Sequence, residues 1–147
     1  MKIYLDVCCL NRPFDDQTQE RIRLEAEAIL FILKRIKAGE WELVSSEMVE
    51  DEIEQTPDMK RRERLRLLMA EANQFVLVTE PEVTRAKQLR QSGLNSADAL
   101  HLACAESGGV DLFLTTDDKL LRRALALTPP LAIRVFNPLA WLMEQEK

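Results

Sequence analysis

The chain begins with a short apolar run that ends in a carboxylate, KIYLD at residues 2–6. Its length and β-propensity favour a buried strand over a helix. A second short apolar run, at residues 111–114, leads into the polar sequence Thr115-Thr116-Asp117. Helical patterns fill most of the chain between these two runs. Such alternation predicts a parallel sheet that carries helices on both of its faces.

The same alternation continues outward from these two runs. The other expected strands lie at residues 41–45, 75–78 and 133–136. A polar loop containing Pro13 is expected at 11–17, and Thr115-Thr116 are expected to cap a helix at 117–126. Three other helices are expected in the first half of the chain, at about 19–38, from the cap Ser46 to before Pro57, and at 58–72. Three more are expected after it: from Pro81 to before Ser92-Gly93, from a cap at Asn95 or Ser96 to before Gly108-Gly109, and after Asn137-Pro138. The pattern predicts one α/β domain over residues 1–147, with a central parallel sheet of about five strands.

Composition sets limits on the class of protein. A chain of 147 residues with 46% hydrophobic residues is long enough for one domain that buries roughly 70% of its unfolded surface. Its longest apolar stretch, residues 28–33, is far shorter than the ~20 residues of a membrane span. No signal peptide opens the chain, and its 3 cysteines are too few for a disulfide scaffold. We expect a soluble cytoplasmic protein without a membrane partner.

The charge balance limits how this protein can bind nucleic acid. The net charge is −5 and the isoelectric point is near 5.0, so the chain as a whole repels a phosphate backbone. A nucleic-acid role therefore requires local basic patches or a bound cation that reverses the sign of an acidic site. The basic run at residues 60–66, KRRERLR, is a candidate phosphate-contacting face, and a solvated helix surface is an equally good interpretation.

Four carboxylates are expected at one end of the predicted sheet. Asp6 and Asp117 follow the strands at 2–6 and 111–114, while Glu52 and Asp98 lie on neighbouring helices. Ligands of open parallel sheets bind outside the carboxyl ends of the strands, and Mg²⁺ and Mn²⁺ prefer oxygen ligands. A bound cation would turn the mutual repulsion of these acids into attraction and could activate water.

Each carboxylate also has an ordinary structural interpretation. Asp98 and Asp117 suit the first turn of a helix, and Glu52 belongs to a run of acidic residues. Asp6 is different, because burying an unpaired carboxylate at the end of a strand is costly. The combination of the four residues, rather than any one of them, indicates a metal site.

Other motifs carry less information. His101 lies one helical turn after Asp98 and could assist it, but a single histidine in an apolar helix is more often packed and hydrogen-bonded. Cys8 and Cys9 do not form a Cys-x-x-Cys pair, and packing is the better interpretation for both. With 4 glycines, the chain has neither a P-loop nor a dinucleotide-binding fingerprint. An aspartyl-phosphate enzyme would need a second aspartate at position 8, which is cysteine.

Four ordered motifs resemble those of the PIN-domain family. They are IYLD at 3–6, SEMVEDEI at 46–53, SADALHLA at 96–103 and LTTD at 114–117. The resemblance extends from the first strand to the last. The family consists of small α/β proteins and includes metal-dependent ribonucleases, among them the VapC-type toxins of toxin–antitoxin pairs.

The resemblance implies roles for individual residues. The implied catalytic acids are Asp6, Glu52, Asp98 and Asp117, of which Asp6, Asp98 and Asp117 would hold one or two Mg²⁺ or Mn²⁺ ions. Asn11 and Thr115 match auxiliary polar positions of the family. Glu50 would replace Glu52 if the alignment slips by two residues, and Cys8-Cys9 stands where the family more often has small or hydroxyl residues.

The leading hypothesis is a metal-dependent endoribonuclease that acts as the toxin of a toxin–antitoxin pair. Its expected partners are an RNA substrate, an antitoxin and a second copy of the chain, and Arg12 is a candidate phosphate contact beside Asp6. The alternative is a non-catalytic PIN-like scaffold that binds RNA or a protein. Retention of all four acids favours the enzyme.

Overall fold

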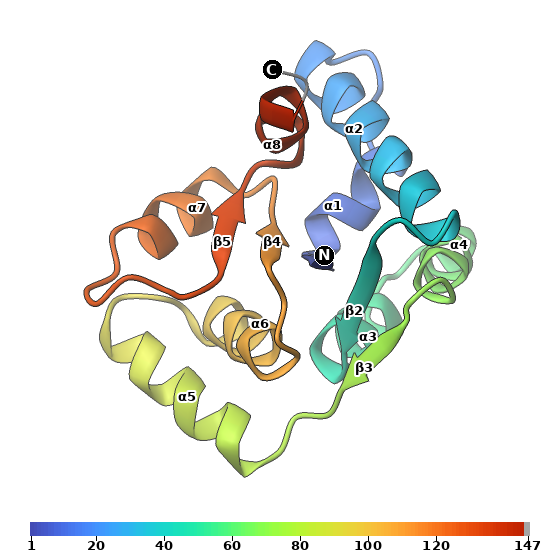
Figure 1. Cartoon of the computed structure of the whole chain (residues 1–147). Coiled ribbons are helices and arrows are strands. Elements are labelled where there is room, and N and C mark those ends of the chain that lie inside the picture. The colour runs from blue at the N-terminus through green and yellow to red at the C-terminus, as the bar shows by residue number, and fades with distance from the viewer. Residues whose placement is uncertain (146–147) are drawn as a thin grey trace.

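Residues 1–145, which the computed structural model describes, form one α/β domain with a five-stranded, all-parallel sheet in the order β3-β2-β1-β4-β5 (Figure 1). The strands are β1 (Lys2–Leu5), β2 (Glu42–Ser46), β3 (Gln74–Val76), β4 (Leu112–Leu114) and β5 (Arg134–Phe136). The helices are α1 (Val7–Asn11), the 3₁₀ turn η1 (Arg12–Phe14), α2 (Glu20–Lys37), α3 (Glu47–Glu54), α4 (Met59–Met69), α5 (Glu80–Gln91), α6 (Ser96–Ser107), α7 (Asp118–Leu125) and α8 (Pro138–Gln145). The predicted fold class is confirmed.

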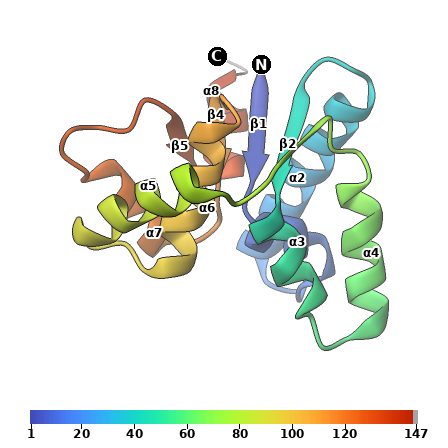
Figure 2. The same cartoon turned by 90° about the horizontal axis from the view of Figure 1, so that it is seen from below.

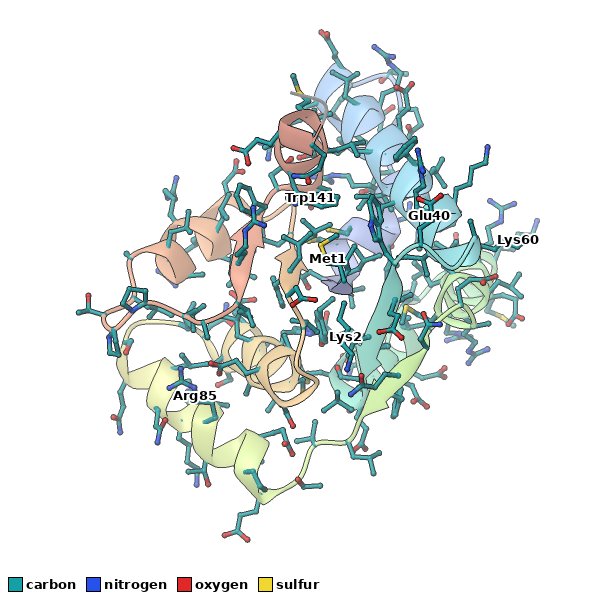
Figure 3. The ribbon with its side chains drawn as sticks, in the orientation of Figure 1. Met1, Lys2, Glu40, Lys60, Arg85 and Trp141 are labelled. Atoms are coloured by element: carbon teal, nitrogen blue, oxygen red, sulfur yellow. The ribbon has the colours of Figure 1, made fainter. Side chains whose placement is uncertain are left out.

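Helices cover both faces of the sheet, as the alternating pattern predicts. Helices α2 and α8 lie on one side and α5 and α6 on the other (Figure 1). Helix α2 buries the apolar stripe that includes Ile29, Ile32 and Ile36. On α8, the indole of Trp141 is buried and packs edge-on against Trp41, with ring centroids 5.3 Å apart (Figure 3). Within the described residues, no helix combines the length and apolar character that crossing a bilayer requires.

The central strand β1 positions the candidate site. It pairs with β2 on one side and β4 on the other, and the Tyr4 ring stacks on Phe113 with centroids 5.2 Å apart. Figure 2 shows β1 running from the N-terminus toward α1 and α3. Since Leu5 is in register with Leu114, the residues that follow β1 and β4 emerge together at the carboxyl edge. The chain reverses its strand order between these two strands, where α/β sheets bind ligands.

Two local predictions were wrong. The expected loop at 11–17 is shortened by helix α1 and turn η1, because Asp6 caps α1 and Pro13 fits the start of a 3₁₀ turn. The cap of α7 is Asp117 and not the two threonines. The Asp117 carboxylate reaches two free backbone N–H groups, whereas the Thr115 hydroxyl donates its hydrogen bond to Asp6.

Candidate active site

Asp6 is a buried carboxylate that the ends of two strands hold in place. Its backbone N–H continues the β1–β4 ladder by donating to the Leu114 carbonyl, 3.0 Å away. Its side chain accepts from the Val7 N–H at 2.8 Å, the Thr115 hydroxyl at 2.9 Å and the Cys8 thiol at 3.4 Å. These donors stabilise a charged carboxylate that is only 7% exposed. Cys8 therefore contributes the polar support that a small hydroxyl residue would otherwise give.

Asp117 is fixed by the helix that it caps. One carboxylate oxygen accepts from the N–H groups of Lys119 and Leu120, at 2.9 and 3.2 Å. Its own backbone N–H donates to the Thr115 hydroxyl oxygen at 3.1 Å. Thr115 thus connects Asp6 and Asp117 through its hydroxyl.

Asp98 lacks such support. It lies in the first turn of α6, and its backbone N–H donates to the capping side chain of Asn95 at 2.8 Å. No donor in residues 1–145 lies within hydrogen-bond distance of its carboxylate. Burial and the negative charges of Asp6 and Asp117 raise the pKa of the Asp98 carboxyl above its usual value, although His101 opposes them. Asp98 is therefore the acid whose charge most needs a cation.

Glu52 is held by a buried hydrogen-bonded chain. One of its carboxylate oxygens contacts Nε2 of His101, and Nδ1 of His101 lies 2.7 Å from the Tyr4 hydroxyl. The Tyr4 hydroxyl lies 2.7 Å from Oγ of Ser46. Burial opposes a charge on His101, but the hydrogen bond to Glu52 and the nearby charge of Asp6 outweigh it and raise the pKa of His101. His101 is thus both a packed residue and a direct partner of a predicted catalytic acid.

The four predicted acids line one open cleft at the carboxyl edge of the sheet. Its lining comprises Asp6, Val7, Cys8, Asn11, Met48, Asp51, Glu52, Gln55, Ala97, Asp98, His101 and Asp117. No lysine or arginine is among these residues. Glu50, the alternative to Glu52, instead lines a separate hollow beside Arg66 and Phe75. The geometry therefore favours Glu52 as the member of the acidic set.

The donor set suits a hard divalent cation. Every acidic group in the cleft offers carboxylate oxygens, as Mg²⁺ and Mn²⁺ prefer. Within the described residues, no group of three or more His, Cys, Asp or Glu side chains is placed so that it could hold a metal ion together. Mg²⁺ usually keeps several waters beside one or two carboxylates, so an open cleft of this kind fits it better than a structural zinc ion.

The structure does not bring Arg12 to the cleft. Its guanidinium donates to Glu25 at 2.8 Å and to Asp15 at 3.1 Å, and its side chain is 20% exposed. The Glu25 side chain is only 1% exposed and needs cationic partners where it lies. Two of the five cations in the basic run at 60–66 form ion pairs: Arg61 with Asp15, and Arg66 with Glu54 and Glu63.

Asn11, the other residue predicted to be auxiliary, lines the cleft. Its amide donates to the Val7 carbonyl at 3.1 Å, and its side-chain oxygen accepts from Arg61 at 3.3 Å. Sequence reasoning gave too little weight to Cys8 and His101, which contact Asp6 and Glu52. The i+3 spacing of His101 from Asp98 was the available signal.

Comparisons with known proteins agree with this geometry. The sequence profile of the PIN domain matches residues 3–125. FitAcB from Neisseria gonorrhoeae superposes with a TM-score of 0.59 at 19% identity, over 92% of this chain and 97% of its own. VapBC2 from Rickettsia felis, in a structure bound to a DNA fragment from the VapBC2 promoter, superposes with a TM-score of 0.62 at 13% identity. The match covers 93% of this chain and 98% of that chain. Among curated protein sequences, none matches.

These findings bear on the fold and the family. At such low identity, the two structures show that this chain shares their fold. The profile match covers most of the sequence, including the segments that carry all four acids. The chain belongs to the PIN domain family.

Proposed function

We propose that this protein is a Mg²⁺- or Mn²⁺-dependent endoribonuclease. The observation that carries the proposal is the cleft itself, in which Asp6, Glu52, Asp98 and Asp117 gather from four separate elements without a lysine or arginine among them. Four carboxylates in one cleft repel one another and an RNA phosphate, which favours a bound cation. Membership of the PIN domain family supports a nuclease.

The chain's own residues would divide the work as follows. Asp6, Asp98 and Asp117 would hold the ion, which supplies an activated water and stabilises the charge that develops on the phosphoryl group. Thr115 and the Val7 N–H orient Asp6. His101 contacts one carboxylate oxygen of Glu52 and fixes its position, and the other oxygen would accept a proton from the attacking water.

Cleavage of RNA by the purified protein tests the proposal. In Mn²⁺, with a mixture of structured RNAs, we expect cleavage by the wild type and none after chelation of the metal or in Asp98→Asn. Equal cleavage by both proteins would reveal a contaminating nuclease. Absence of cleavage of any RNA would favour the non-catalytic scaffold instead.

A matched pair on helix α3 tests the assignment of the glutamate. Glu52→Gln and Glu50→Gln make the same chemical change two residues apart, but only Glu52 lines the cleft. We expect Glu52→Gln to lower kcat by 10²-fold or more, in the range of general acid–base contributions. Glu50→Gln should retain the wild-type rate, and the reverse result would reassign the site to Glu50.

We further propose that the protein is the toxin of a toxin–antitoxin pair and works in the cytoplasm as a homodimer. The resemblance to VapC-type toxins and the shared fold with VapBC2 and FitAcB support an antitoxin partner. Two-fold symmetric dimers are the commonest assemblies of soluble proteins. An antitoxin arginine or lysine could pair with the acidic cleft. Light scattering of the purified chain, alone and co-expressed with the product of any adjoining small reading frame, measures both associations.

A further inference from the structure

A basic hollow lies where helix α5 ends and helix α6 begins. It is lined by Lys87, Arg90, Gln91, Leu94, Asn95 and Ser96, with no acidic residue among them. Every member except Leu94 is exposed to solvent. In a chain of net charge −5, this local excess of positive charge contrasts with the acidic cleft.

Both cations of this hollow are free. In the described part of the chain, no carboxylate oxygen lies within 4.0 Å of Lys87 or Arg90. On the same helix, Arg85 pairs with Glu106 at 2.7 Å (Figure 3). Most other arginines are also engaged with carboxylates, namely Arg12, Arg21, Arg23, Arg35, Arg61 and Arg66. The charges of Lys87 and Arg90 are thus available to an external anion.

The hollow adjoins the acidic cleft along the backbone of α6. Ser96 lines the hollow, and the next two residues, Ala97 and Asp98, line the cleft. Asn95 uses its side-chain oxygen to cap the helix, which leaves its amide N–H groups available as donors. An anion in the hollow and a phosphate at Asp98 would therefore both lie at the N-terminal end of α6.

We propose that this hollow binds a backbone phosphate of the single-stranded RNA that enters the acidic cleft. The inference rests on the proposed ribonuclease function and assigns a path to its substrate. Free lysine and arginine side chains bind RNA mainly through its phosphates. With no aromatic side chain in the hollow, it offers no surface on which a base could stack. The subsite should therefore strengthen RNA binding without reading its sequence.

Binding is measured with a fluorescent single-stranded RNA in Mg²⁺ on the full-length protein carrying Glu52→Gln, which slows cleavage and leaves the three proposed ion ligands in place. Adding Lys87→Ala/Arg90→Ala should weaken binding about tenfold and reduce the slope of log K against log[salt] by about 0.7, the contribution of the one phosphate contact that is lost. Both side chains are exposed, so the melting temperature should not change. In the otherwise wild-type protein, the same pair should raise the KM for RNA cleavage.

The matched control is Lys34→Ala/Lys37→Ala, which removes the same charge from α2 where it leads into β2, at the opposite edge of the sheet. We expect little change in affinity or salt slope for this variant. Equal effects of the two pairs would overturn the subsite and leave the ribonuclease intact. RNA neither bound nor cleaved by any form of the protein would overturn the proposed function, and the subsite with it.

Discussion

Two carboxylates of this chain, Glu25 and Asp98, differ in how far neighbouring side chains compensate their negative charge. Glu25 is 1% exposed and accepts hydrogen bonds from Arg12 at 2.8 Å, Arg21 at 3.2 Å and Asn137 at 2.6 Å. Asp98 is half-buried, and the described residues offer its carboxylate no donor. Glu25 has its charge compensated from three elements, whereas Asp98 faces other acids.

The difference separates a structural charge from a functional one. The partners of Glu25 connect η1, α2 and the residue before α8, so this ion network fixes how these segments pack. Asp98 adds repulsion to the cleft, and its burial together with the charges of Asp6 and Asp117 raises its pKa. A chain that compensates Glu25 so fully leaves Asp98 uncompensated where an external cation can bind.

The largest predicted effect comes from breaking the compensated charge. Glu25→Gln should lower the free energy of unfolding by about 3 kcal/mol, because it leaves the mostly buried Arg12 without its main partner. Urea denaturation followed by tryptophan fluorescence measures this loss. Glu27→Gln is the matched control on the same helix, since Glu27 makes only an exposed 3.5 Å pair with Arg23 and should cost less than about 0.5 kcal/mol. Equal losses of unfolding free energy in both variants would show that the buried ion network of Glu25 adds no more stability than an exposed ion pair.

The next effect comes from supplying the charge that Asp98 lacks. Mg²⁺ or Mn²⁺ at 100 times its Kd should stabilise the wild type by about 2.7 kcal/mol, measured as a rise in melting temperature. Asp98→Asn should blunt this response and, without metal, should melt no lower than the wild type, because it removes like-charge repulsion. If millimolar metal left the melting temperature of the wild type unchanged, Asp98 would not be a charge that a cation compensates, and its contrast with Glu25 would be wrong.

A smaller effect is the pH dependence that Asp98 confers on metal-free protein. Its pKa in the folded state lies above the ordinary value of 3.8, so the native state keeps this proton up to a higher pH than the unfolded state does. Asp98 therefore contributes full relative stability below pH 3.8, and this contribution is lost as the pH rises through the folded pKa. The unfolding free energy of wild type minus that of Asp98→Asn should fall over this window and then level off. A difference that rises with pH would contradict the environment described for Asp98.

The sequence alone predicts the position of Asp6 and the buried face of α2, but the role of Glu25 was missed. Asp6 could be identified because a buried strand rarely ends in an unpaired carboxylate, and the α2 stripe followed from its helical period. That same stripe contained a missed signal. Glu25 lies three residues after Ile22 and four before Ile29, which places it on the buried face and implies cationic partners.

Other features depend on contacts between distant segments. Glu52 and Glu50 differ by two positions in an acidic run, and only the packing of α3 against α6 brings Glu52 to His101. Arg12 is engaged because Glu25 lies beside it. On α5, Arg85 pairs with Glu106, and no carboxylate of the described residues pairs with Lys87 or Arg90. No spacing along the chain indicates which cation finds a partner.

The smallest predicted effect concerns the exposed margin of the Glu25 network, where Arg21 makes two 2.8 Å hydrogen bonds to Asp118. Their side chains are 54% and 56% exposed, so water and salt screen the pair. A double-mutant cycle with Arg21→Ala and Asp118→Ala should give a coupling of about 0.5 kcal/mol that shrinks in 1 M salt. Arg12→Ala is the comparison: Arg12 is 20% exposed, and its loss should cost about 2 kcal/mol. If Arg21 proved as costly to remove as Arg12, compensation of Glu25 would depend on the number of its cations rather than on their burial.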